Sequence, residues 1–142
     1  MKTVKLIAVF AENKHGQLAS VTHLLTQEGV NIRWVNIASS ETFGVIKFLV
    51  DKTDLAYQCL RKHGLAASLI DTLAIEVEDQ PGGRYAVASC LSGIGVNVEN
   101  ASGFVANNRA VLLLEVRNAE HARQALEGKQ LRLLSEEDVL SL

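Results

Sequence analysis

The sequence of 142 residues has no strong excess of either charge, only two cysteines and no long hydrophobic run. Its formal net charge of -2 argues against a nucleic-acid-binding protein, which would need a basic stripe to neutralise phosphates. The cysteines, Cys59 and Cys90, form no CxxC motif, so the sequence predicts neither a zinc knuckle nor a redox pair. This cysteine usage favours a reduced, intracellular setting.

Signals for secretion and for membrane insertion are also missing. The apolar stretch KLIAVF near the N-terminus is shorter than a secretory core and runs directly into the polar stretch AENKHG. No apolar run approaches the length that spans a bilayer. We therefore expect a cytoplasmic protein that binds neither membranes nor nucleic acids.

Motifs for catalysis and metal binding are absent as well. No serine lies in a GxSxG elbow, and the four histidines include no pair at metal-ligand spacing on a helix. The Gly82-Gly83 pair lacks the glycine-rich length and the lysine of a phosphate-binding P-loop. The sequence therefore predicts a protein without enzymatic activity, metal or cofactor.

A repeat of 66 residues organises the sequence. Gly29-Val30-Asn31 returns as Gly95-Val96-Asn97, each time after a helix-like stretch. The same shift aligns further turn and apolar positions: Gly16 with Gly82, Val21 with Val87, Leu25 with Leu91, and Leu60 with Leu126. Turns and apolar faces repeat together, which indicates a duplicated unit. We place the two domains at residues 1–72 and 73–142.

The elements of one unit follow from its apolar periodicity. The first unit is expected to contain strands near 3–10, 31–39, 43–51 and 68–78 and helices near 15–29 and 53–64. The order is therefore βαββαβ, twice. Right-handed crossovers place both helices of such a unit on one face of an antiparallel sheet. This predicts a ferredoxin-like α/β (α+β) fold, with no flexible linker in 69–78 and one continuous sheet.

The other face of the sheet is expected to be apolar. The alternation in GVIKFLV turns Ile46, Phe48 and Val50 toward the helices and leaves Val45, Lys47 and Leu49 on the open face, joined by either Trp34 or Val35. An exposed apolar face often marks a partner. The sequence therefore predicts a homodimer, formed sheet to sheet or edge to edge.

The loop before the first helix of each unit also recurs, as ENKHGQL and EDQPGGR. Both loops offer an acidic or amide side chain and then a glycine at the start of a helix. A helix N-terminus can hold a carboxylate, and glycine allows a ligand close to the backbone. Alternatively, Gly16 and Gly82 only make tight turns. Asn31 and Asn97 can likewise be turn-formers or ligand-binding residues.

Two long segments, ENKHGQLASVTHLLTQEGVNI and EDQPGGRYAVASCLSGIGVNV, resemble the signature of the ACT domain, a small regulatory module that binds amino acids. That signature has an acidic or amide residue, Pro-Gly-x-Leu, a helix, and Gly-(Val/Ile)-Asn-Ile. Together the two copies cover almost the whole chain, so the sequence resembles a stand-alone tandem ACT protein.

The resemblance implies ligand sites where the loop of one ACT unit meets a neighbouring unit. The first set of residues would be Asn13, His15, Gly16, Gln17 and Leu18, with Asn31 and Ile32 nearby. The second set would be Asp79, Gln80, Pro81, Gly82, Gly83 and Arg84, with Asn97.

The sequence departs from the ACT pattern at two positions. His15 stands where proline is usual, which should soften the first loop. Arg84 takes the place of a normally buried leucine, the equivalent of Leu18. Because an unpaired buried arginine is costly, Arg84 should either point outward or reach a ligand carboxylate.

The expected function is a non-enzymatic regulatory protein that binds an amino acid and passes the signal to a partner enzyme or regulator. Ligand binding would shift the packing of ACT units or a dimer equilibrium. One alternative is a regulatory subunit of an amino-acid biosynthetic enzyme, similar to the small subunit of acetolactate synthase. Another is a small ferredoxin-like enzyme such as an acylphosphatase, with Arg84 in a phosphate loop.

Overall fold

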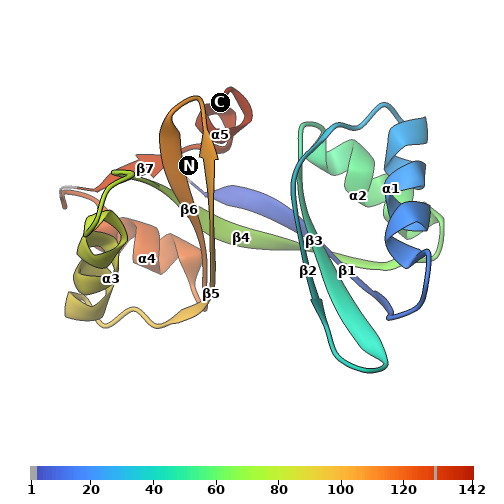
Figure 1. The fold of residues 1–142 in the computed structure, drawn as a ribbon, viewed down its shortest axis with the longest axis horizontal. Coiled ribbons are helices and arrows are strands. Elements are labelled where there is room, and N and C mark those ends of the chain that lie inside the picture. The colour runs from blue at the N-terminus through green and yellow to red at the C-terminus, as the bar shows by residue number, and fades with distance from the viewer. Residues whose placement is uncertain (1–2, 130) are drawn as a thin grey trace. The chain divides into compact units, whose positions relative to one another are not determined.

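In the computed structural model, which describes residues 3–129 and 131–142, the chain folds as two βαββαβ units (Figure 1). The N-terminal unit is Lys5–Ile70, and the C-terminal unit is Asp71–Leu142. Thr3 and Val4, at the start of the chain, also belong to the C-terminal unit. Strand β4 (Ala66–Val77) is the last strand of the first unit and the first strand of the second. The predicted order of elements is thus confirmed, and β4 runs without interruption through all but the last residue of the stretch 69–78, where no linker was expected.

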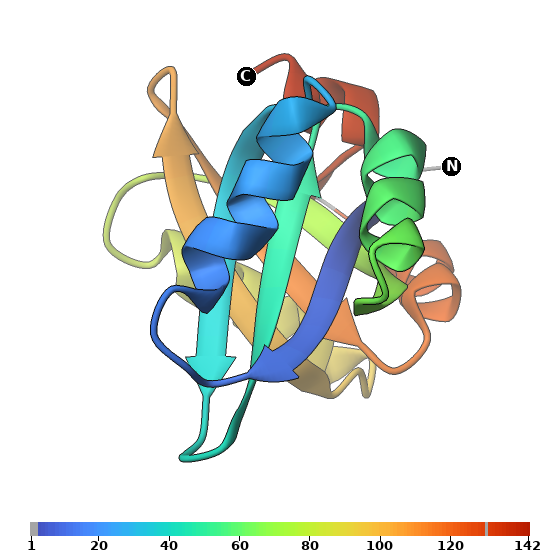
Figure 2. The same cartoon turned by 90° about the vertical axis from the view of Figure 1, so that its right-hand side faces the viewer.

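The N-terminal unit has a sheet of order β2-β3-β1-β4. Besides β4, its elements are β1 (Val4–Glu12), α1 (Gln17–Gln27), β2 (Ile32–Ser39), β3 (Phe43–Val50) and α2 (Thr53–Lys62). Strand β3 pairs antiparallel with both β1 and β2. The two helices lie together over one face of these strands (Figure 2). Strand β2 is the edge of the sheet.

The core of this unit lies between the sheet and its two helices. Phe48 is fully buried, and it belongs to one cluster with Val21 and Leu25 of α1 and Leu60 of α2. Burying each such side chain stabilises the fold by roughly 1.5–3 kcal/mol. The predicted inward set of Ile46, Phe48 and Val50 is confirmed, because all three belong to this cluster.

The opposite face of the sheet is less open than predicted. Trp34 pairs with Leu49 across the strands, so Trp34, and not Val35, lies on this face. Leu49, however, is only 1% exposed, so its expected exposure was wrong. The exposed large side chains on this face are Phe10 and Phe43, near the end of the sheet where β1 ends and β3 begins.

The C-terminal unit repeats this plan, with a sheet of order β7-β4-β6-β5. Its further elements are α3 (Gly83–Gly93), β5 (Val98–Ala106), β6 (Arg109–Val116), α4 (Ala119–Leu126), β7 (Arg132–Leu134) and α5 (Glu136–Leu140). Ser135 and Asp138 form a reciprocal capping box at the start of the last helix.

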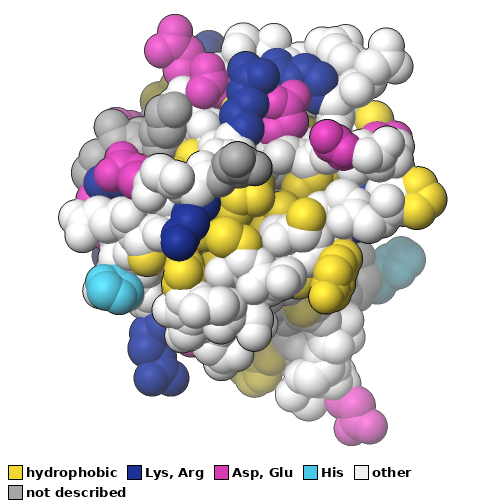
Figure 3. Space-filling model, turned by 90° about the vertical axis from the view of Figure 1, so that its left-hand side faces the viewer, with side chains coloured by type: hydrophobic (Ala, Val, Ile, Leu, Met, Phe, Trp, Pro, Cys, Tyr) yellow, Lys and Arg dark blue, Asp and Glu magenta, His cyan; other side chains and the backbone are white. Residues whose placement is uncertain are grey.

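Several hydrophobic side chains that pack against the core of the C-terminal unit are only partly buried. The hydrophobic side chains that are only partly buried there are Cys90, Ile94, Val96, Val98, Leu112 and Leu131. In the N-terminal unit they are Ile32, Tyr57 and Leu65. Figure 3 shows hydrophobic side chains grouped at the surface of the C-terminal unit, with charged side chains around them.

Candidate functional site

The loop between β1 and α1 is tied to the hairpin that joins β2 and β3. The backbone N–H of Asn13 donates to the carbonyl of Thr42 at 2.9 Å, and its side-chain amide donates to the carbonyl of Ser40 at 2.9 Å. Two hydrogen bonds from one residue therefore hold the loop in place. An asparagine suits this position because its side chain carries donors that a neighbouring turn can accept.

Helix α1 begins at Gly16 without a side-chain cap. Gly16 has φ of 83°, a left-handed conformation that favours glycine, and a Cβ there would meet no atom within 4 Å. The first turn of a helix carries backbone N–H groups that lack helical partners. Since no side chain caps these groups, the space above Gly16 suits a carboxylate.

A small cavity of about 100 Å³ lies between this loop, the start of α1 and the sheet. Its lining residues are Ala11, Glu12, Asn13, Lys14, Gln17, Leu18, Ile37, Ser39, Gly44 and Ile46. His15 and Gly16 are exposed and lie outside this lining. Leu18 is 37% exposed, so the expectation that it is buried was wrong: it forms part of the cavity wall.

The corresponding loop of the C-terminal unit folds against its own helix. Gly82 has φ of 90° and starts α3 as Gly16 starts α1. A Cβ at Gly83 would lie only 2.1 Å from the carbonyl oxygen of Glu78, so glycine alone fits there. The side-chain amide of Gln80 also donates to the Glu78 carboxylate. The backbone of the loop thus occupies space at the helix start that the first unit leaves open.

A cavity of about 330 Å³ lies beside this second loop. Its lining residues are Glu76, Val77, Glu78, Gln80, Pro81, Gly82, Gly83, Ala86, Val87 and Leu131. Asp79 and Arg84 are exposed and lie outside this lining. The sequence left two orientations open for Arg84, outward or toward a ligand carboxylate, and the exposed position agrees with the outward one. Because Arg84 is exposed, its charge carries no burial penalty, and its counterpart Leu18 is exposed too.

The repeated asparagines lie at the other end of each unit. Asn31 precedes β2, where its N–H donates to the Asp51 carboxylate at 2.9 Å, whereas Ser40 follows β2. At roughly 3.3 Å per residue, β2 separates Asn31 and Ile32 from the Asn13 loop by about 25 Å. Asn97 likewise precedes β5 and lines a cavity other than the one beside Gly82. Within one unit, the structure does not bring the predicted sets together.

The sequence did not single out an ionic cluster between strands of the C-terminal unit. Glu76 on β4 accepts a hydrogen bond from Arg109 on β6 and pairs with Arg132 on β7 at 3.0 Å. The hydrogen bond from Arg109 is the main reason that the pKa of Glu76 lies below its usual value. These three residues are far apart in sequence, so no local spacing pointed to them.

Two further observations concern the classes of site that the sequence argued against. None of the described helices is long and apolar enough to cross a membrane. Among residues 3–129 and 131–142, no three His, Cys, Asp or Glu side chains are grouped so that they could hold a metal ion.

Comparison with known proteins assigns the chain to a family. Residues 2–142 match the ACT domain pair family, and no curated protein matches. The crystal structure of protein BT0572 from Bacteroides thetaiotaomicron has a TM-score of 0.92 and 30% identity, over 99% of this chain and 98% of that one. The regulatory subunit of aspartate kinase from Thermus thermophilus shares the fold, with a TM-score of 0.60 and 18% identity over 86% and 89% of the two chains. The chain therefore belongs to the ACT domain pair family.

Proposed function

We propose that this protein is a non-enzymatic sensor that binds an amino acid at the loop Asn13–Leu18 of its N-terminal unit. The observation that carries the proposal is the cavity beside this loop, next to a helix start that no side chain caps. The backbone N–H groups of α1 would bind the ligand carboxylate. Leu18 and Ile37 would contact an apolar side chain of the ligand, because both are exposed at the cavity wall.

The edge strand β2 supports a site that is shared between two copies of the chain. Val35 and Ile37 are 44% and 48% exposed on this edge strand, where Val35 pairs with Phe48 and so points to the helix side. An exposed apolar edge strand is suited to pairing with another strand. These residues favour the edge-to-edge form of the homodimer over the sheet-to-sheet form.

Antiparallel pairing of β2 with β2 of a second copy explains how the separated residues would meet. Asn31 lies at one end of β2 and the Asn13 loop at the other. Antiparallel strands place the start of one beside the end of the other. Asn31 and Ile32 of the second copy would then complete the site at Asn13–Leu18, which no single unit does.

The second loop is the weaker candidate for an amino-acid site. The Glu78 carbonyl lies against the start of α3, and neither Asp79 nor Arg84 lines the adjacent cavity. A test of Arg84 is simple, because Arg84→Leu restores the leucine found at position 18. Unchanged ligand affinity in this variant would remove Arg84 from any binding role.

A second candidate function is that of a separate regulatory subunit. The Thermus thermophilus protein of the same fold is a regulatory subunit of aspartate kinase, and 89% of that chain is covered. In this version of the proposal, the ligand-bound form would associate with a catalytic partner. Purification from the native cell with bound amino acid, followed by identification of any co-purifying enzyme, separates a subunit from a stand-alone sensor.

The proposal is tested by thermal unfolding of the whole chain in the presence of each of the twenty amino acids. A ligand that binds only the folded state at a hundredfold excess over Kd stabilises that state by about 2.7 kcal/mol. We expect a rise of several degrees in Tm for one or two related amino acids. A flat response with all twenty contradicts the sensor function for the isolated chain.

A further inference from the structure

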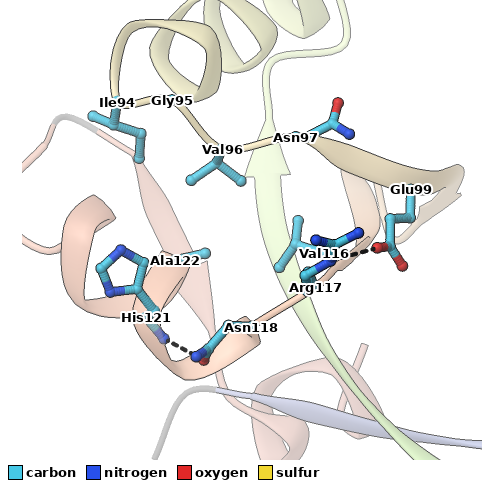
Figure 4. Close-up of a pocket in the computed structure, with 10 residues that line it drawn as sticks. All are labelled: Ile94, Gly95, Val96, Asn97, Glu99, Val116, Arg117, Asn118, His121 and Ala122. Carbon is cyan, nitrogen blue, oxygen red and sulfur yellow. Dashed lines mark hydrogen bonds and ion pairs between the residues drawn. The ribbon is translucent and has the colours of Figure 1, made fainter.

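A separate cavity of about 300 Å³ lies in the C-terminal unit, between the end of α3 and the start of α4 (Figure 4). Its apolar wall contains Ile94, Val96, Val116 and Ala122, and its polar rim contains Asn97, Glu99, Arg117, Asn118 and His121. None of these residues belongs to the loop Asp79–Arg84. The cavity is therefore distinct from the loop sites considered above.

In the N-terminal unit, the corresponding place is closed by two charged side chains. The Asp51 carboxylate accepts a hydrogen bond from the N–H of Asn31 at 2.9 Å. The Lys52 ammonium donates to the carbonyl of Gly29 at 3.2 Å. Val30 between them is only 6% exposed. The side chains of the consecutive residues Asp51 and Lys52 thus provide hydrogen-bond partners for the N–H of Asn31 and the carbonyl of Gly29.

The C-terminal unit has lost both closing side chains. The 66-residue shift places Arg117 at the position of Asp51 and Asn118 at that of Lys52. Arg117 turns outward, 3.7 Å from Glu99, and Asn118 instead caps α4 by accepting from the N–H of His121 at 3.0 Å (Figure 4). Among the described residues, no hydrogen bond joins Arg117 or Asn118 to the segment 95–97.

Two further observations show that the space beside the segment 95–97 of the C-terminal unit is open. A Cβ at Gly95 would meet nothing within 4 Å, whereas one at Gly29 would meet the Lys52 ammonium at 3.8 Å. Val96 is only partly buried, whereas its counterpart Val30 is buried. The backbone groups that Asp51 and Lys52 satisfy in one unit therefore face a cavity in the other.

We propose that this cavity binds a free zwitterionic amino acid with an aliphatic side chain, whose carboxylate and ammonium take the places that Asp51 and Lys52 fill in the N-terminal unit. The carboxylate binds the N–H of Asn97, on the side of the cavity where Arg117 lies, and the ammonium binds the carbonyl of Gly95 (Figure 4). The side chain of the ligand contacts Val96 and Val116. A volume near 300 Å³ is at the small end of ligand cavities, which suits a metabolite of this size.

The first test uses L-leucine as the probe and the intact chain labelled with nitrogen-15. We expect saturable shifts of the backbone amides of Asn97, Arg117 and His121 in the millimolar range. Two analogues each lack one charge: 4-methylpentanoate has no amine, and 3-methylbutylamine has no carboxylate. Each should bind at least about tenfold more weakly than L-leucine, because one of the two backbone groups stays unpaired.

A variant that copies the closed unit gives the second test. The double substitution R117D/N118K places the closing carboxylate and ammonium in the C-terminal unit, and we expect it to abolish the L-leucine shifts at Asn97. Loss of the Asn118 cap can reduce stability in this variant. The two analogues therefore test the same point on the unmodified chain.

Three results would overturn this inference. One is the absence of saturable L-leucine shifts at Asn97 and Arg117. Another is equal binding of L-leucine and either single-charge analogue. The third is unchanged binding in a folded R117D/N118K chain. Shifts confined to Asn13–Leu18 would support the proposed sensor site and contradict this second one, so failures of the two proposals are distinguishable.

Discussion

Gly16 and Gly82 begin their helices in the same left-handed conformation, but the residues that follow them differ. Gln17 follows Gly16 and lines a cavity, whereas Gly83 follows Gly82 and allows the Glu78 carbonyl close to α3. Because only glycine fits at position 83, the second loop can collapse onto its helix in a way that Gln17 does not permit. A single position thus separates two loops that otherwise share a plan.

The substitution Gly16→Ala is a direct test of the loop conformation. Alanine in the left-handed region costs about 1 kcal/mol, so we expect the free energy of unfolding to fall by about that amount. Gly93→Ala is the matched control, because Gly93 ends α3 with no atom within 4 Å of a Cβ. It should gain about 0.5 kcal/mol from helix propensity. Urea unfolding measures both, and equal effects of the same sign would contradict the account.

The pKa of Glu76 predicts how stability depends on pH. Because this pKa is lowered in the folded chain, its contribution is fully present above the unfolded pKa of about 4.3 and is lost as pH falls through the folded pKa. Glu76→Gln should therefore lower the free energy of unfolding by about 1 kcal/mol at neutral pH. The difference from the wild type should shrink in acid. A difference that stays constant from neutral pH to pH 3 would contradict this assignment.

Among the elements, the edge strand β2 is the one that we expect to pair with a second copy of the chain. Ile37→Lys places a charge on the exposed, helix-facing side of this strand, where it should weaken pairing with a second copy without unfolding the chain. Leu55→Lys on α2 is the matched control, since Leu55 is 43% exposed outside the edge. Analytical ultracentrifugation should show dissociation for Ile37→Lys only. An unchanged dimer in Ile37→Lys would contradict the edge-to-edge arrangement.

Periodicity and turn residues predicted the elements well because they act locally. The alternation in GVIKFLV correctly predicted that Phe48 faces the helices. The burial of Leu49 and the exposure of Leu18 were not predictable in this way. They depend on which elements cover a given face, which is a long-range property. The ion cluster at Glu76 could not be predicted for the same reason, because the partners of Glu76 lie 33 and 56 residues away in sequence.

For the whole molecule, the proposed site shared between two copies of the chain would link ligand binding to assembly. A site completed by Asn31 of a second copy binds its ligand only in the assembled form. Such a ligand stabilises assembly by its differential affinity for the two states, and by nothing more. The two units need not respond alike, because the structure gives them different loops and different cavities.

The most direct measurement of the central claim is a calorimetric titration of wild type and Leu18→Arg with the amino acid that raises Tm most. This substitution gives the first loop the arginine that the second loop has at position 84. Because Leu18 is 37% exposed, the fold should tolerate the change. We expect the affinity to fall at least about tenfold, with Leu55→Arg unchanged. Equal affinity in wild type and Leu18→Arg would show that the amino acid does not bind at the Asn13–Leu18 loop.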